Sequence, residues 1–256
     1  MEDLLAGFCA WQMWVLLGLT DIRQRYKRSR FGQFWITFST GVFVAGIGIV
    51  YSYLFNRDIH EYIPYLSINI VFWTFIAGIV TDSIDVFTQA GQYLRHQALP
   101  KTAFVMRVLV RQLLVLAHNV VIIAVVFLVF GVPLPNTMPF VLPGLAVLLP
   151  AAFLISITIG LLCTRFRDLP QIVHSLLQIA FFLTPIMWQV DQMGERSHYI
   201  VNYNPFAIFL MLVTEPLHGR LPGWDIYGRA FAIIMAVALV TAPLFARFRA
   251  RIVYWL

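Results

Sequence analysis

The chain has 256 residues, of which 60% are hydrophobic and only 12% are Asp, Glu, Lys or Arg. Soluble globular domains carry about 25% charged residues, and folded monomers rarely expose large apolar patches to water. The mean hydropathy of +0.80 therefore excludes an ordinary water-soluble fold and predicts an all-α integral membrane protein.

Six membrane spans are predicted from the stretches that lack charged side chains. A helix needs about 20 mostly apolar residues to cross the hydrocarbon core. The uncharged stretch 112–164 is long enough for two crossings, and the Gly and Pro residues between Gly131 and Pro143 predict the turn that separates them. The predicted spans are 34–55, 62–84, 104–130, 141–163, 171–190 and 228–247.

The distribution of basic residues predicts the orientation of these spans. An even number of crossings places both termini on one side, and 14 of the 18 Lys and Arg residues fall on that side. The other side carries only Arg57, Arg196, Arg220 and Arg229. Because cytoplasmic loops are enriched in Lys and Arg, both termini are expected to be cytoplasmic. The net charge of +6 then reflects orientation and anionic lipid, and it is weak evidence for nucleic-acid binding.

The N-terminal segment predicts a helix that lies in the membrane interface. Gly7 to Leu19 is apolar and contains Trp11 and Trp14, but it is short for a crossing. Glu2 and Asp3 stand where a signal peptide would carry basic residues. An amphipathic interface helix fits best, and a short helix buried against the bundle is the alternative.

The sequence lacks the motifs that enzyme or ATPase chemistry would require. A phosphate-binding loop ends in Gly-Lys-Ser or Gly-Lys-Thr, whereas the two lysines, Lys27 and Lys101, follow Tyr26 and Pro100. Two cysteines, Cys9 and Cys163, provide neither a disulfide framework nor a metal-ligand spacing. We expect no catalytic residue, metal or cofactor on this chain.

Three polar residues near the spans have alternative interpretations. His118 lies within the third span, where a neutral histidine hydrogen-bonded across a helix interface is favoured over a proton relay. Asp82 and Asp85 lie three residues apart at the end of the second span. For this pair a salt bridge to Arg107 or Arg111 is favoured over acid–base catalysis.

Two side-chain patterns mark helix faces in the spans. Gly41, Ala45, Gly48 and Ser52 form a small-residue stripe in the first span, which favours close helix packing. The fifth span carries a polar and aromatic ridge, which is the candidate glycan-facing surface, with interhelical packing as the alternative. Its members are His174, Gln178, Phe181, Pro185 and Trp188.

A short helix is predicted between the fifth and sixth spans. Asn204 and Pro205 can cap and begin a helix. The apolar run from Phe206 to Val213 is too short to cross, and Thr214 to Gly219 carries stop signals. A re-entrant or periplasmic helix follows, which is suited to gating a conduit because its ends need protein or water around them.

Five sequence segments in this order resemble the membrane subunits of ABC-2 type polysaccharide exporters, such as O-antigen and capsule permeases. The basic run DIRQRYKRSRFGQFW at 21–35 is the most specific of them. The others are Leu99-Pro100, Arg167-Asp168-Leu169, Phe181 to Ile186 (FFLTPI) and Asn204-Pro205. The resemblance covers essentially the whole chain.

The resemblance implies a single transmembrane domain over 1–256 that works as a homodimer in the bacterial inner membrane. Two copies of a separate ABC subunit would bind ATP and Mg and drive export of a lipid-linked polysaccharide, with O-antigen as the favoured substrate. The implied parts are a cytoplasmic interface helix and basic segment at 1–30, spans one to five at 34–190, a periplasmic gate region at 191–227 and span six at 228–247.

The resemblance also assigns residues by position. Segments 7–29 and 87–101 are expected to contact the ATPase, with Arg25, Tyr26, Arg28, Arg95 and Arg167 as coupling residues. Asn204, Pro205 and Phe206 would belong to the periplasmic gate.

Other functions remain open from the sequence. A capsule or teichoic-acid exporter would look much the same. An ion-coupled secondary transporter would want repeated halves and an intramembrane acid, and neither is evident. An integral membrane transferase using His118 would need a second acid–base group that the sequence does not identify.

Overall fold

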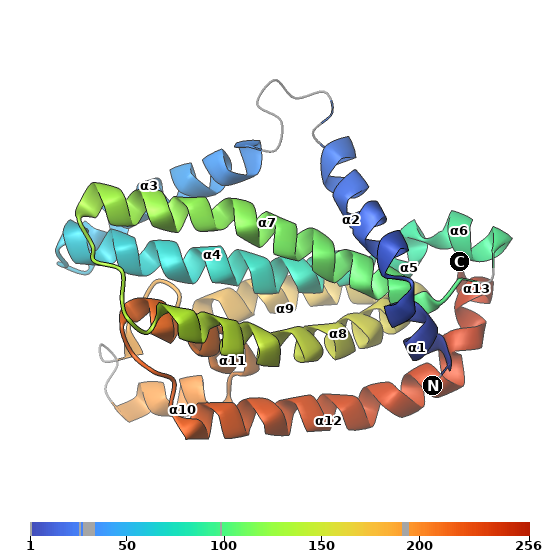
Figure 1. Ribbon diagram of the computed structural model, residues 1–256. Coiled ribbons are helices and arrows are strands. Elements are labelled where there is room, and N and C mark those ends of the chain that lie inside the picture. The colour runs from blue at the N-terminus through green and yellow to red at the C-terminus, as the bar shows by residue number, and fades with distance from the viewer. Residues whose placement is uncertain (1, 26, 28–33, 98, 191–194) are drawn as a thin grey trace.

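The computed structural model describes residues 2–25, 27, 34–97, 99–190 and 195–256, and the described chain is a bundle of helices (Figure 1). The N-terminal half contains α1 (Glu2–Cys9), α2 (Trp11–Arg25), α3 (Phe34–Leu54), α4 (Ile59–Ile84), α5 (Val86–Gln89), α6 (Gly91–His96) and α7 (Lys101–Phe130). The C-terminal half contains η1 (Met138–Phe140), α8 (Val141–Arg165), α9 (Leu169–Leu183), α10 (Glu195–Tyr203), α11 (Pro205–Thr214), η3 (Glu215–His218), α12 (Trp224–Phe248), η4 (Arg249–Arg251) and α13 (Ile252–Trp255).

Five helices of the described chain are long and apolar enough to cross a membrane: α3, α4, α7, α8 and α12. They confirm five of the predicted spans to within a few residues. The N-terminal pair α1 and α2 passes the same test only when taken together, although the two helices are bent by 65°. The chain is therefore a multi-pass membrane protein, and its described residues provide five or six apolar crossings.

The fifth predicted span is shorter than expected. A span over 171–190 was predicted, but α9 has 15 residues and ends at Leu183, which gives about 22 Å at 1.5 Å per residue. Thr184 adopts an extended backbone, with φ −92° and ψ 140°. The residue before a proline disfavours the helical region, and Pro185 explains why the helix stops there.

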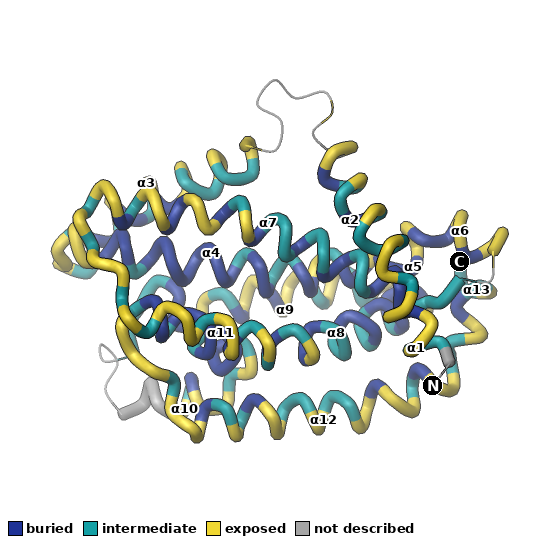
Figure 2. Tube along the Cα trace, in the orientation of Figure 1, coloured by how far each residue is buried: buried dark blue, intermediate teal, exposed yellow. Residues whose placement is uncertain are grey.

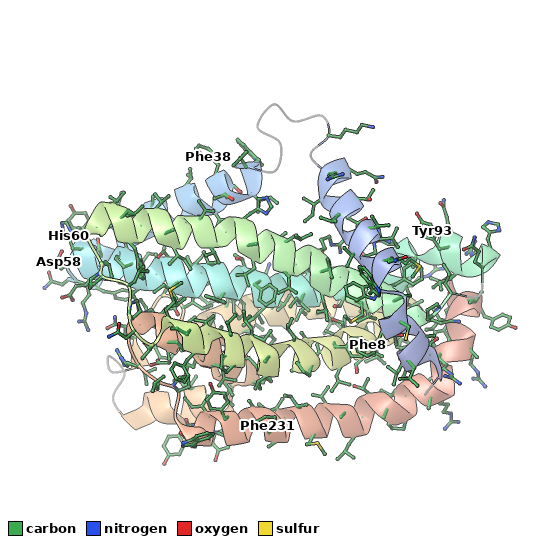
Figure 3. All side chains as sticks on the ribbon, in the orientation of Figure 1. Phe8, Phe38, Asp58, His60, Tyr93 and Phe231 are labelled. Carbon is green, nitrogen blue, oxygen red and sulfur yellow. The ribbon has the colours of Figure 1, made fainter. Side chains whose placement is uncertain are left out.

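Helix α4 forms the centre of the bundle, and α3 and α12 lie at its outside. In the most apolar window of α4, 78% of the residues are buried, against 11% in the windows of α3 and α12 (Figure 2). Phe38 of α3 and Phe231 of α12 point away from the bundle (Figure 3). These outer faces are apolar, so lipid or another apolar surface must cover them.

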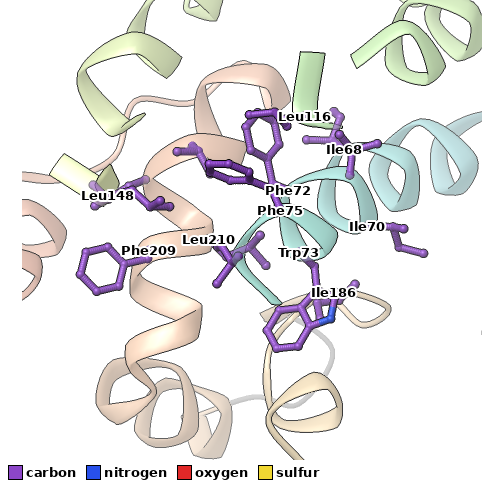
Figure 4. Packing of buried hydrophobic residues seen from close by; sticks show 14 of the residues in the cluster. Ile68, Ile70, Phe72, Trp73, Phe75, Leu116, Leu148, Ile186, Phe209 and Leu210 are labelled. Atoms are coloured by element: carbon purple, nitrogen blue, oxygen red, sulfur yellow. The ribbon is translucent and has the colours of Figure 1, made fainter. Parts of the chain in front are cut away.

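The main core gathers large side chains of α4 against the neighbouring helices. Phe72, Trp73 and Phe75 of α4 pack with Leu148 of α8 and Leu210 of α11 (Figure 4). A short helix between two crossings would normally expose its backbone ends to lipid. Here α11 is surrounded by α4, α8 and α12, so protein surrounds it at membrane depth.

The small-residue stripe of the first span is divided between two environments. A methyl group added at Gly48 would lie 2.8 Å from Ile63 Cγ1, so α3 approaches α4 closely there. Gly41 and Ala45 instead line an apolar cavity of about 590 Å³ between α3, α4 and α7. Close packing is thus confirmed at Gly48, in the second half of the stripe, and not at Gly41.

The N-terminal segment is two helices, not the single helix predicted. Gly7 faces Thr102 and Gly18 faces Val110, so both α1 and α2 pack on α7. Leu5, Phe8, Trp11 and Leu16 remain exposed. The segment combines both interpretations: one side is docked on the bundle, and the other presents the apolar residues of an interface helix.

A second, smaller core closes the end of the bundle that holds both termini. Phe87 of α5, Leu94 of α6, Ile157 of α8 and Ile252 of α13 are buried together there. Arg165 lies over the rings of Phe166, Phe248 and Trp255 at 5.2–5.6 Å. The C-terminal helix α13 is thus fixed against the short helices that follow the second span.

Candidate functional site

A cluster of partly buried charges joins three helices near the end of the bundle that holds the termini. Asp21 of α2 accepts hydrogen bonds from Arg107 of α7, with Nε–Oδ2 at 2.7 Å, and from Arg111 Nη1 at 3.2 Å. Arg111 also pairs with Asp82 of α4 at 2.9 Å. Gln112 donates a further bond to Asp82. We call these five residues the charged cluster.

The burial of the charged cluster makes its pairing important for the fold. Asp21, Asp82, Arg107 and Arg111 side chains are only 12–15% exposed. The positive charges of the two arginines balance the negative charges of the two carboxylates. Removal of one of these four side chains would leave a partly buried charge without a partner, which destabilises the fold. The cluster therefore holds α2, α4 and α7 in one arrangement.

The predicted salt bridge of the second span is confirmed for Asp82. Its partner is Arg111, one of the two arginines expected. Arg107 pairs instead with Asp21, which the sequence did not single out. The Asp85 carboxylate lies outside this network and is 3.3 Å from Thr88 Oγ1.

His118 makes a different contact from the one predicted. Its Nδ1 lies 2.7 Å from the Leu114 carbonyl oxygen, one turn earlier in the same helix. The bond that crosses between helices uses the backbone, since Thr37 Oγ1 donates to the His118 carbonyl at 3.1 Å. The expectation of a ring bonded across the interface is therefore wrong, because Nδ1 of the ring bonds to a carbonyl of its own helix.

The structure separates the predicted coupling residues. Tyr26 and Arg28 lie outside the described residues, as does the side chain of Arg25, whose backbone ends α2. Arg95 is exposed on α6, and its guanidinium donates to the carbonyl oxygen of Leu256. Arg167 is exposed in the turn between α8 and α9.

The non-helical segment after α9 is held by tyrosines of α4. Tyr62 Oη donates to the Met187 carbonyl at 2.7 Å, and Tyr65 Oη donates to the Trp188 carbonyl at 2.9 Å. Backbone carbonyls away from water need such partners. The segment 184–188 is thus attached to the first turns of the central helix.

The predicted helix start at Asn204 and Pro205 is confirmed. Asn204 Oδ1 accepts from the Phe206 and Ala207 amides at 2.9 and 3.4 Å, which caps α11. Asn204 Nδ2 also donates to Thr184 Oγ1 at 3.0 Å. The side chain therefore joins the start of α11 to the residue that follows α9, while Phe206 contacts Trp73 with ring centroids 5.7 Å apart.

Comparison with known proteins places this architecture in a family. Residues 12–217 match the family described as ABC-2 type transporter. The match runs from α2 through most of η3 and so includes the charged cluster, α9 and the capped helix α11. The chain belongs to the ABC-2 transporter family.

Curated proteins similar to this ABC-2 chain carry a more specific name. One O-antigen export system permease protein RfbA of Klebsiella pneumoniae is 23% identical over 198 residues, which is 77% of this chain and 76% of the relative. A second protein of that name and organism is 27% identical over 203 residues, or 78% of each chain. These matches confirm the family resemblance of the sequence motifs.

The ridge that the sequence predicts in the fifth span is only partly a helix face in this ABC-2 chain. His174 and Gln178 are exposed on α9, and Phe181 packs on Trp73 with centroids 5.8 Å apart. Pro185 and Trp188 lie beyond the end of α9, so the helical spacing that placed them on the same face does not hold. Trp188 instead donates from Nε1 to the Phe182 carbonyl at 3.1 Å.

Two features of the site lacked a usable sequence signal. Asp21 is separated from its partners by 86 and 90 residues, and no spacing rule connects them. The rings around Arg165 come from α12 and α13 as well as from the adjacent Phe166. A basic residue followed by an aromatic is too common a pattern to indicate such a cluster.

Proposed function

We propose that this chain is the membrane-spanning subunit of an ATP-driven exporter that moves a lipid-linked polysaccharide, of the O-antigen class, outward across the bacterial inner membrane. The observation that carries the proposal is the match over about three quarters of the chain to proteins named O-antigen export permeases. The subunit works as a homodimer, and both termini face the cytoplasm.

Energy for export comes from a partner in this proposal. Two copies of a separate ABC subunit bind ATP and Mg, because the sequence of this chain has no phosphate-binding loop of its own. Positions Arg25, Tyr26, Arg28, Arg95 and Arg167 contact or couple to that partner. The exposure of Arg95 and Arg167 supports this role.

Helix α4 provides a route from the ATPase side to the gate. Asp82 near its end joins α2 and α7 through the charged cluster, while Tyr62 and Tyr65 near its start hold the segment after α9. A rigid shift of α4 relative to α7 would therefore move both the charged cluster and the segment after α9. ATP binding can drive such a shift only if the partner contacts the two states differently.

The glycan path lies between the two subunits in this proposal. The exposed side chains of α9, His174 and Gln178, with Phe181 behind them, face that path. Pro185 and Trp188 line its outer end, and Asn204, Pro205 and Phe206 form the gate. The bond from Asn204 to Thr184 supports this assignment, because it lets a movement of α9 reach α11 directly.

Deletion and complementation in a strain that makes surface polysaccharide test the proposal. Loss of the chain should leave lipid-linked glycan in the inner membrane and remove it from the cell surface. Complementation with the Arg95→Glu variant should restore export only partly, and the control Arg57→Glu, an exposed arginine at the other end of the bundle, should restore it fully. Normal surface glycan in the deletion strain would contradict the proposal.

A further inference from the structure

A cavity of about 660 Å³, lined by both polar and apolar side chains, lies at the end of the bundle opposite the charged cluster. Its walls come from the first turns of α4, the loop 132–136 that follows α7, and the end of η3 with Arg220. His60, which lines it, is at the end of the bundle where α4 begins (Figure 3). We call this space the distal cavity, and its volume lies within the range of small-molecule sites.

Two stacked rings form part of the wall. The rings of Tyr65 and His218 lie 5.0 Å apart and nearly parallel, at 28°. Tyr65 is fixed by its bond to Trp188. His218 Nε2 lies 3.4 Å from Asn69 Oδ1. The rings are thus held in place before any ligand arrives, which lowers the entropic cost of binding.

The polar groups of the distal cavity favour an uncharged ligand with many hydroxyls. Glu61 brings one carboxylate and Arg220 one guanidinium, so the formal charges balance. Burial and the nearby Arg220 charge lower the pKa of His218 to about 4, so this imidazole stays neutral at pH 7. The Glu61 carboxylate accepts hydrogen bonds and the Arg220 guanidinium donates them, so the cavity offers both kinds of group.

A metal ion does not fit the distal cavity. Grouped His, Cys, Asp and Glu side chains that could hold one are absent from the residues described. Asn69 is buried behind the stacked rings and does not line the cavity, so its contact with His218 supports the ring wall from inside the protein.

We propose that the distal cavity is a saccharide-binding site, which holds a neutral pyranose unit of the exported glycan against the Tyr65 and His218 wall. A pyranose has apolar C–H faces that suit flat rings and equatorial hydroxyls that suit paired donors and acceptors. The identity of the glycan rests on the proposed function. The residues that line the site all come from one subunit.

Direct binding to the purified chain in lipid nanodiscs tests this proposal. The probe is the oligosaccharide repeat unit cut from the surface glycan of the source strain, followed by saturation-transfer NMR. Glu61→Gln and Arg220→Ala should each weaken binding by about tenfold or more, since each removes a hydrogen bond to a charged group. Arg57→Ala removes a positive charge as Arg220→Ala does, but outside the cavity, and it should leave binding unchanged.

Three outcomes would overturn the proposal: no binding of the oligosaccharide, equal binding by all variants, or binding of inorganic phosphate alone. The binding measurement is independent of the deletion experiment. Oligosaccharide binding that is sensitive to Arg220, in a protein whose deletion leaves export intact, would retain the site and reject the proposed function. If deletion of the chain abolishes export but the purified protein does not bind the oligosaccharide, the proposed function is retained and the proposed site is rejected.

Discussion

Asp21 links α2 to α7, because its carboxylate pairs with both Arg107 and Arg111. The pairing of Asp82 with Arg111 could be predicted, because both lie near the same end of consecutive spans. The pairing of Asp21 with Arg107 could not, because it depends on how α2 docks on α7. The glycine at position 18, which lets α2 approach Val110, has meaning only once that docking is known.

Replacement of Asp21 by Asn should destabilise the protein by about 1–3 kcal/mol, because it leaves Arg107 without its carboxylate in a partly buried setting. Thermal unfolding in nanodiscs measures the change. The control is Asp168→Asn, which makes the same chemical change at an exposed position with no side-chain capping bond. Equal midpoints for wild type and Asp21→Asn would show that the charged cluster does not hold α2.

His218 should make stability depend on pH. Its folded pKa of about 4 lies below the usual 6.5, so the unfolded chain takes up the proton first as the pH falls. The stability contributed by the neutral ring is complete above about pH 6.5 and is lost toward pH 4. Unfolding midpoints of wild type and His218→Gln should converge over this interval, and a difference that is constant with pH would contradict the assignment.

The sequence contains a signal for the early end of helix α9, but the apolar character of the stretch led to the prediction of a longer span. The uncharged stretch continues to Val190, which suggested a full span. Pro185 gave the local signal that Thr184 would leave the helical region. The hydrogen-bond donors to the backbone carbonyls after α9 could not be predicted from the sequence. They are the hydroxyl groups of Tyr62 and Tyr65, which lie more than a hundred residues earlier in the chain.

The helix start at Asn204 was predictable because capping is local, and the structure confirms it. The close contact of α11 with α8 was not. A methyl group at Gly144 would lie 2.3 Å from the Leu212 carbonyl oxygen, so no side chain fits between these helices.

Gly144→Ala should therefore displace α11 and destabilise the protein by about 1–3 kcal/mol, since a backbone atom cannot move aside as a side chain can. Thermal unfolding and limited proteolysis between residues 191 and 223 measure the effect. Gly228→Ala on α12, where an added methyl group meets nothing within 4 Å, should be neutral or slightly stabilising. Identical behaviour of the two variants would contradict the close α8–α11 contact.

Composition and hydropathy predict that the whole molecule is a bundle of membrane helices. Which helix lies at the centre of the bundle is known only from the structure. Helix α4 looked like one span among six, yet it is the most buried of the crossings. Near one end it carries Asp82 of the charged cluster, and at the other end its first turns form part of the wall of the distal cavity. The apolar outer faces of α3 and α12 are the surfaces left for lipid or a second subunit.

We expect this ABC-2 chain to translocate glycan only with energy from a partner ATPase. Proteoliposomes containing lipid-linked oligosaccharide measure this directly, with the chain alone or with the ABC subunit and ATP. Outward movement of the glycan is expected only when both proteins and hydrolysable ATP are present. Movement by the chain alone, driven by an ion gradient or without any energy source, would contradict it.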